Sequence, residues 1–256
     1  MSTALITGGA KRIGAHIARR LAAEGFRLAI HYNASSKDAQ ALRDELNQNG
    51  EICEIFQADL ADKADLTRAF IAAREWLGGV RLCINNASLF VNDDLTGITE
   101  AAFDAHLAVN VKAPVYLAEL VYAQCGGLED CLIVNMLDNK VFALNPDFFS
   151  YTISKQALHS ATRLLARKFD GFPRVCGVAP SITLVSGDQT QEEFERTSRI
   201  NPLHRRVAPE DLAQTIIYMW HEKALDDQII TVDGGQTLMR LPRDVAFLQS
   251  KGEGNE

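Results

Sequence analysis

Short apolar runs with a β-type composition alternate along this chain with segments in which apolar residues recur every three or four positions. The second spacing is that of an amphipathic helix, and strands that are separated by helices pair in parallel through right-handed crossovers. The alternation therefore predicts an α/β fold with a doubly wound, seven-stranded parallel sheet and helices on both faces. We expect strands at 3–7, 27–32, 52–57, 82–85, 131–136, 174–178 and 229–232, and helices at 13–23, 39–47, 66–77, 103–122, 151–168 and 209–220.

Nothing in the sequence divides this alternation into separate domains. The 256 residues contain no internal repeat, no low-complexity block and no Gly/Ser linker, so we expect one domain over 1–256. Two segments interrupt the alternation, at 181–201 and 241–256. The first follows a strand end, where ligands bind in open parallel sheets, and is interpreted as a substrate lid rather than a mobile surface loop. The second is interpreted as a strap at an interface.

Charge and hydropathy restrict the class of partner. The formal net charge is -7 and no basic block offsets it, which argues against a nucleic-acid partner and favours a small molecule. No apolar run reaches the roughly 18 residues of a membrane span, and no signal-peptide pattern opens the chain. We therefore expect a cytoplasmic protein with no membrane partner.

The five cysteines form no CxxC motif and have no histidine at metal-ligand spacing. Their pattern predicts neither a disulfide framework nor a metal site. It favours small buried side chains in a reducing compartment. The residues concerned are Cys53, Cys83, Cys125, Cys131 and Cys176.

A glycine-rich turn joins the first predicted strand to the first predicted helix. It reads Thr7-Gly8-Gly9-Ala10-Lys11-Arg12-Ile13-Gly14. Small residues let the backbone approach a pyrophosphate closely, and the N-terminus of the helix supplies unpaired N–H groups. The placement of the turn predicts a Rossmann-type dinucleotide site, with contacts from Gly8, Arg12, Ile13 and Gly14.

The end of the second strand favours NADP(H) over NAD(H). Segment 31–37 has no carboxylate where an NAD enzyme usually places one for the ribose 2′-hydroxyl. Polar groups on Tyr32, Asn33 and Ser35 instead suit a 2′-phosphate, which an aspartate would repel. The alternative is that these residues only cap the next helix.

Tyr151 and Lys155 form a YxxxK motif within a predicted helix. Residues four apart share one face of a helix, so the two side chains are expected to lie together. The ammonium group can then lower the pKa of the Tyr151 phenol and orient the cofactor, while Tyr151 passes a proton.

Taken in order, these motifs resemble the short-chain dehydrogenase/reductase family. The glycine turn, the Asn-Asn-Ala-Ser sequence at 85–88 and YxxxK at 151–155 carry the resemblance. Arg12 stands where the family usually has a glycine; arginine is not conformationally permissive, but it can place a guanidinium beside phosphates. The resemblance implies an oxidoreductase, a homotetramer and an asparagine, Asn110, that holds a water beside Lys155. It also implies cofactor contacts from Asp59, Leu60, Asn86, Ala87, Ser88, Pro180 and Ile182.

Asp138 departs from the family pattern, which has a serine at this place before the tyrosine. A serine hydroxyl can donate to a developing alkoxide, whereas an ionised carboxylate would oppose that negative charge. A carboxyl group suits a nitrogen heterocycle, because it can accept from ring N–H and amino groups or help to deliver a proton to a ring nitrogen.

With Asp138 included, the motifs resemble those of pteridine reductases and the related dihydromonapterin reductases, over about residues 3–240. The resemblance implies that Phe90 stacks on one face of the pterin, with the nicotinamide on the other. Asp138 and Tyr151 would flank the reacting edge of the ring, and Ser88 and Arg12 would bind substrate or cofactor phosphate.

Two positions depart from the pteridine reductase pattern. Ala34 stands where those enzymes carry a basic residue, and Ser181 replaces the glycine that usually follows the proline at 180. The predicted reaction is the reduction of a C=N bond of a dihydropterin-type substrate by NADPH. Two alternatives stay open, a carbonyl reductase acting on a 3-oxoacyl or sugar-like ketone, and a non-catalytic protein that senses NADP(H).

Overall fold

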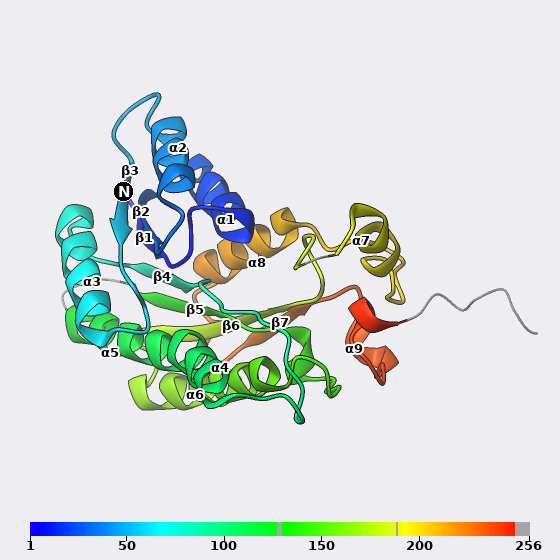
Figure 1. The fold of residues 1–256 in the computed structure, drawn as a ribbon. Coiled ribbons are helices and arrows are strands. Elements are labelled where there is room, and N and C mark those ends of the chain that lie inside the picture. The colour runs from blue at the N-terminus through cyan, green and yellow to red at the C-terminus, as the bar shows by residue number, and fades with distance from the viewer. Residues whose placement is uncertain (127–129, 188, 249–256) are drawn as a thin grey trace, which may run out of the picture.

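Parallel strands form one seven-stranded sheet in the order β3-β2-β1-β4-β5-β6-β7 (Figure 1). The computed structural model describes residues 1–126, 130–187 and 189–248. Because the strand order reverses between β1 and β4, the carboxyl ends of these strands open onto a crevice. The predicted α/β sheet is confirmed, with β1 (Thr3–Ile6), β2 (Arg27–Tyr32), β3 (Cys53–Gln57), β4 (Leu82–Asn85), β5 (Leu132–Met136), β6 (Arg174–Pro180) and β7 (Ile229–Val232).

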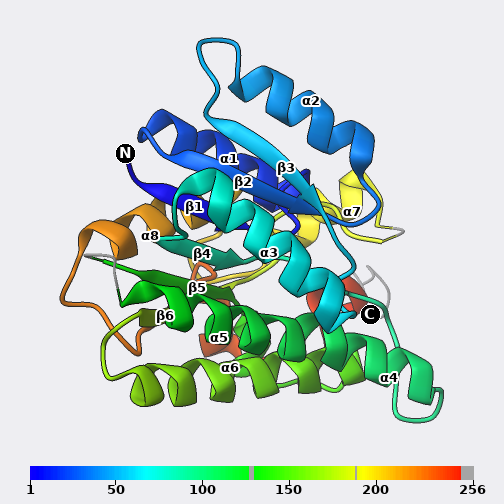
Figure 2. The ribbon, with the colours of Figure 1, turned by 90° about the vertical axis from the view of Figure 1, so that its left-hand side faces the viewer.

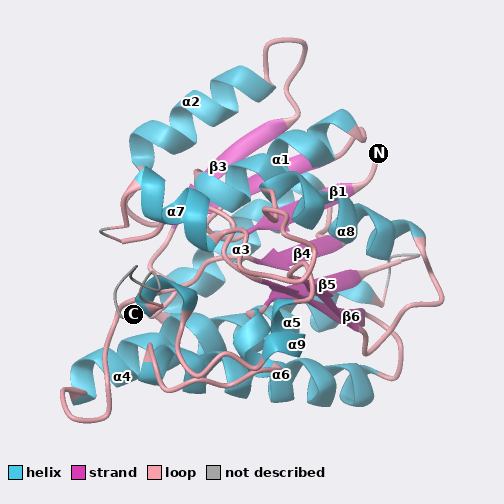
Figure 3. Ribbon diagram, turned by 90° about the vertical axis from the view of Figure 1, so that its right-hand side faces the viewer, coloured by secondary structure: helices cyan, strands magenta, loops and turns pink. Residues whose placement is uncertain are grey.

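Helices cover both faces of the sheet, as Figure 2 and Figure 3 show. Successive side chains of a strand point to opposite faces. In β1, Ala4 and Ile6 pack toward the first helical layer and Leu5 packs toward the second. The first layer contains α1 (Arg12–Ala23), α2 (Ser36–Leu46) and α8 (Pro209–His221), and the second contains α3 (Lys63–Leu77), α5 (Ala113–Cys125) and α6 (Phe149–Phe169).

The helix predicted at 103–122 is interrupted in the structure. It consists of α4 (Glu100–Leu107), a π-helical turn at Ala108–Lys112, and α5. Pro114 lies in the first turn of α5 and has no N–H to bond the carbonyl four residues earlier, so the regular ladder cannot continue there. The interruption brackets Asn110, a predicted site residue.

The segment 181–201 contains a short helix that the sequence did not predict, α7 (Gln191–Thr197). Thr190 and Glu193 form a capping box at its start, and Phe194 within the helix is buried. A second short helix, α9 (Gln236–Met239), follows β7. In the parts of the chain that the structure describes, no helix combines the length and the apolar character that crossing a membrane requires.

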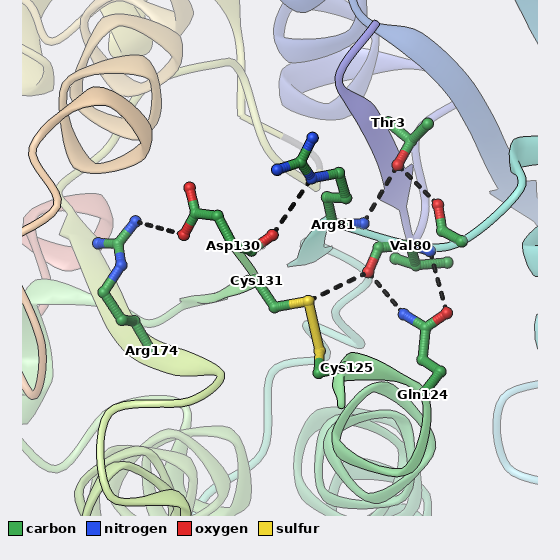
Figure 4. Close-up of a disulfide and its surroundings, with 9 residues drawn as sticks. Thr3, Val80, Arg81, Gln124, Cys125, Asp130, Cys131 and Arg174 are labelled. Atoms are coloured by element: carbon green, nitrogen blue, oxygen red, sulfur yellow. Dashed lines mark hydrogen bonds and ion pairs between the residues drawn. A yellow bond between two sulfur atoms is a disulfide. The ribbon is translucent and has the colours of Figure 1, made fainter. Parts of the chain in front are cut away.

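Two of the cysteines contradict the prediction from their spacing. Cys125 at the end of α5 and Cys131 just before β5 form a disulfide at the amino end of β5, opposite the crevice at the carboxyl ends of the strands (Figure 4). Their six-residue separation belongs to no motif, and only the packing of α5 against β5 brings them together. Cys53, Cys83 and Cys176 are buried free thiols, as predicted.

Candidate active site

A cavity of about 580 Å³ lies at the carboxyl ends of the strands, where the sheet topology places a ligand. The turn after β1, the ends of β2 and β6 and the first turns of α6 all contribute to its wall. Every residue predicted to bind cofactor or substrate lines it: Gly8, Arg12, Ile13, Gly14, Tyr32, Asn33, Ser35, Asp59, Leu60, Asn86, Ala87, Ser88, Phe90, Asp138, Tyr151, Lys155, Pro180 and Ile182.

The glycine turn forms a cradle that side chains would fill. A Cβ atom on Gly14 would overlap the Gly8 carbonyl oxygen and lie 2.7 Å from the Cα atom of Gly9. Asn86 fixes the turn, because its Nδ2 donates to the carbonyl oxygens of Thr7 and Gly8 at 2.9 and 3.0 Å. The cradle opens at the N-terminus of α1, so its shape and its N–H groups fit a pyrophosphate.

Arg12 differs from the prediction in its backbone. Its φ angle is +54°, in the left-handed region that favours glycine, so arginine does take the conformation of the residue it replaces. This backbone conformation is energetically unfavourable for arginine, and it occurs at a position that lines the cavity. There the guanidinium group is available to phosphates.

His31 lines the cavity as well, although it was not among the predicted site residues. The Gly8 N–H donates to His31 Nδ1 at 3.1 Å, and His31 Nε2 lies 3.0 Å from the carbonyl oxygen of Ala58. Burial lowers the pKa of His31, so the ring is neutral and carries its proton on Nε2. His31 could have been predicted as a residue of the site, because it lies in the polar segment that ends β2.

The end of β2 presents polar groups to the cavity without a carboxylate. Tyr32, Asn33 and Ser35 line the wall. Ser35 is the N-cap residue of α2, yet its side chain makes no capping hydrogen bond, so its hydroxyl is available to a ligand. This arrangement fits a 2′-phosphate better than a bare ribose hydroxyl.

Tyr151, Asp138 and Lys155 converge on the inner end of the cavity. The Tyr151 hydroxyl donates to Asp138 Oδ2 at 2.8 Å, and Asp138 Oδ1 accepts from the N–H of Lys140 at 2.9 Å. Lys155 Nζ donates to the carbonyl oxygen of Met136 at 2.8 Å. Tyr151 and Lys155 are only 5% and 2% exposed, so these groups act largely out of contact with water.

Burial sets the protonation of these three groups. It raises the pKa of Asp138 above its usual range, although the Lys140 N–H and the Tyr151 hydroxyl oppose the shift. It also raises the pKa of Tyr151, and the negative charge of Asp138 adds to the effect. The predicted lowering of the Tyr151 pKa by Lys155 is not seen in this structure, because burial and Asp138 raise that pKa instead.

Lys155 gives a testable pH dependence. Burial lowers the pKa of Lys155 to about 8, since an ammonium ion is costly away from water. Below that pH the side chain is charged, so reductive kcat/KM is expected to fall as the pH rises through about 8. In Lys155→Arg the fall should disappear, because a guanidinium group stays protonated. An unchanged fall in this variant would assign the titration to another group.

Phe90 lies at the outer side of the same cavity and contacts the tyrosine. Its ring stacks on Phe148 at 4.4 Å between centroids and meets the edge of Tyr151 at 4.7 Å. The Phe90 side chain is 40% exposed, so one aromatic surface faces the cavity. Phe148, which was not predicted from the sequence, packs against the Phe90 ring.

Asn110 is the one predicted site residue that does not line the cavity. Its side chain accepts from the N–H of Leu89 at 2.8 Å, and donates to the Leu89 carbonyl oxygen and to Ser154 Oγ, both at 2.9 Å. It therefore joins the segment after β4 to the helix that carries Tyr151 and Lys155. The predicted water beside Lys155 stays a prediction.

The two interrupting segments both contribute to the wall of the cavity. Residues of 181–189 line it, and so do Leu241 and residues 243–246. The C-terminal segment is tied to its own chain, because Lys140 Nζ bonds Asp244 Oδ2 at 2.9 Å and the Arg243 guanidinium bonds Asp147. The lid and the interface strap stay predictions, and residues 188 and 249–256 lie outside the described part.

The sequence of this chain matches a known protein family. The profile of the short chain dehydrogenase family matches residues 2–196. The chain belongs to this family. It is therefore an oxidoreductase, and the family resemblance seen in the sequence is confirmed.

Several relatives of this short chain dehydrogenase span nearly its full length. It is 26% identical to the short chain dehydrogenase/reductase nsrJ of Aspergillus novofumigatus, covering 91% of this chain and 94% of the relative. It is 28% identical to pteridine reductase 1 of Leishmania tarentolae, covering 93% and 96%. A crystal structure of FolM alternative dihydrofolate reductase 1 from Brucella canis, complexed with NADP, is 39% identical and has a TM-score of 0.84, covering 93% and 94%.

Proposed function

We propose that this short chain dehydrogenase uses NADPH to reduce a C=N bond of a dihydropterin-type substrate. The cofactor assignment is supported by the carboxylate-free end of β2 and by the NADP in the similar Brucella canis structure. The substrate assignment is supported by the similarity to a pteridine reductase and to an alternative dihydrofolate reductase.

The hydrogen bond between Tyr151 and Asp138 carries the proposal. It places a carboxyl group of raised pKa beside the phenol, within a cavity that also presents the Phe90 ring. An ionised carboxylate in this place would oppose an alkoxide, which a ketone substrate would form. For a ring nitrogen the same carboxyl group is an acceptor for N–H and a store for the proton.

The residues divide the chemistry as follows. When bound, NADPH supplies the hydride for the carbon of the C=N bond. Tyr151 would donate the proton that the nitrogen gains. Asp138, whose carboxyl group is hydrogen-bonded to the phenol, would return a proton to the phenol oxygen. Lys155 places a positive charge beside the tyrosine ring, with Nζ 5.6 Å from the ring centroid. Phe90 covers one face of the flat substrate.

A substrate panel tests the proposal. Purified protein should oxidise NADPH with dihydrobiopterin, dihydromonapterin or dihydrofolate, with kcat/KM at least about 100-fold above that for a 3-oxoacyl or sugar-like ketone. A ketone has no ring N–H for the polar groups of the site, and a substrate that leaves buried polar groups unpaired is strongly rejected. NADH in place of NADPH is the matched cofactor control and should react more slowly. Turnover of ketones but of no pterin would reject the substrate class and leave the family intact.

A homotetramer and a cytoplasmic location belong to the same proposal. They come from the family resemblance and from the sequence, and both stay predictions. Size-exclusion chromatography with light scattering would measure the assembly.

A further inference from the structure

Three polar side chains from separate segments form a hydrogen-bonded network beside Tyr151, in which His106 and Ser150 are buried and Asp93 is partly exposed. The Ser150 hydroxyl donates to the carboxylate of Asp93, and it lies 2.7 Å from His106 Nδ1. Ser150 is the residue before the catalytic tyrosine, Asp93 belongs to the irregular segment after β4, and His106 lies on α4. His106 is 0% and Ser150 1% exposed, so burying these polar groups is tolerated only because they bond one another.

Asp93 supplies the cap that α6 lacks. The residue at its N-cap position, Phe148, has no side-chain acceptor, and the first turn contains no acidic residue. Instead the Asp93 carbonyl oxygen accepts from the N–H of Phe149 at 3.1 Å, and Asp93 Oδ1 accepts from the N–H of Ser150 at 2.9 Å. A carboxylate at this end also complements the helix dipole. The start of the helix that carries Tyr151 is thereby fixed to the segment after β4.

The hydrogen bonds of His106 fix its tautomer. The N–H of Val91 donates to His106 Nε2 at 3.3 Å, so Nε2 carries no proton. The proton is then on Nδ1 and points to Ser150 Oγ, whose own hydrogen goes to Asp93. Burial lowers the pKa of His106, which favours this neutral form, and the charge of Asp93 opposes the shift only in part.

His106 and Asn110 bond the backbone on either side of Phe90 in the sequence. They lie four residues apart on consecutive helical turns, and they contact Ser150 and Ser154, which are also four apart. Asn110 bonds the backbone at 89, and His106 bonds the backbone at 91. The segment 88–93, here named the platform loop, is thus pinned on both sides of the ring that contacts Tyr151.

The geometry points to His106, Ser150 and Asp93 as positioning residues that hold the platform loop, and with it the Phe90 ring, against Tyr151 and so set the affinity for substrate. The nature of that substrate rests on the proposed function, whereas the hydrogen-bonded network does not. A protonated His106 would present a hydrogen to the Val91 N–H and lose that bond. The titratable groups that face His106 are Asp93 from the platform loop and Tyr151 from α6, 6.2 Å away between ring centroids. The backbone of Ala102 within α4 raises the pKa of His106, as Asp93 does, and burial outweighs both.

Two substitutions of His106 test the inference by enzyme kinetics. Glutamine can keep an acceptor near the Nε2 position, whereas phenylalanine keeps a ring without one. His106→Phe is expected to raise the KM for dihydropterin about tenfold, the effect of losing about 1.4 kcal/mol of hydrogen bonding, with kcat changed less than about threefold. His106→Gln should stay close to wild type, and the exposed His221→Gln is the matched control.

The pH profile separates positioning from simple support of the fold. In the wild-type protein, KM for the substrate should rise as the pH falls below the lowered pKa of His106, because protonation breaks the bond to Val91. In His106→Gln this rise should be absent, since glutamine does not titrate in this range. The same rise in that variant would remove His106 from the inference.

Amide hydrogen exchange tests the network without any substrate, so its failure is distinguishable from failure of the proposed function. In His106→Phe, exchange of the platform loop should become about tenfold faster, while the amides of β5 (Leu132–Met136) keep their wild-type rates. Ser150→Ala, which keeps the backbone cap from Asp93, should act in the same direction. The inference is overturned if both variants leave the loop unchanged, or if both accelerate β5 by the same factor.

Discussion

Replacing Tyr151 with phenylalanine is expected to lower kcat about 1000-fold, within the range that a lost general acid costs, while NADPH still binds. The substitution removes one oxygen atom and keeps the ring that packs against Phe90. Tyr151 is 5% exposed and bonds Asp138, so no water molecule is expected to take over the position of the hydroxyl group efficiently. Steady-state turnover and an NADPH fluorescence titration measure the two quantities.

Tyr122→Phe is the matched control for this result. Tyr122 is 49% exposed on α5 and stacks on Phe169, outside the cavity lining, so its hydroxyl should be dispensable. Loss of turnover with retained NADPH binding would also reject the alternative of a non-catalytic NADP(H) sensor. Activity of Tyr151→Phe within about tenfold of wild type would remove the phenol from the proton path.

Much of the fold could be predicted from local sequence patterns, which can be identified without knowing which residues are in contact. The alternation of strand and helix fixed the sheet, and the rule that ligands bind at carboxyl strand ends brought the turn at 7–14 and the YxxxK motif to one cavity. The break at Ala108–Lys112 was hidden, because apolar spacing continues through it and only Pro114 marks it.

What the sequence could not supply are the pairings between distant segments. The Asp93 cap on α6, the Lys140–Asp244 ion pair and the Cys125–Cys131 disulfide each depend on which surfaces pack, and no spacing encodes them. The direction of the Tyr151 pKa shift could not be predicted from the sequence for a related reason. The motif places an ammonium near the phenol, but the surrounding burial decides the direction of the shift.

Substitution of Asp138 distinguishes the pterin assignment from an ordinary carbonyl reductase. Asp138→Asn is expected to lower kcat on dihydropterin about 100-fold or more, because the amide can still accept from Tyr151 but cannot carry a proton. Asp138→Ser should lose pterin turnover to a similar extent and gain measurable ketone reduction, since a hydroxyl can donate to an alkoxide. Both are measured as kcat on the same substrate panel.

The local role of Asp138 does not confuse this test. Asp138 also caps the short helix at Asn139–Val141 by accepting from the Lys140 N–H, and asparagine and serine are both good capping residues. Asp62→Asn is the matched control, since Asp62 caps α3 outside the cavity lining and the change should leave activity intact. If Asp138→Asn turned over pterins at the wild-type rate, the carboxyl group would have no part in proton transfer. The assignment of a ring nitrogen as the proton acceptor would then fail, because a hydrogen-bonding group such as the family's serine would be enough for the reaction.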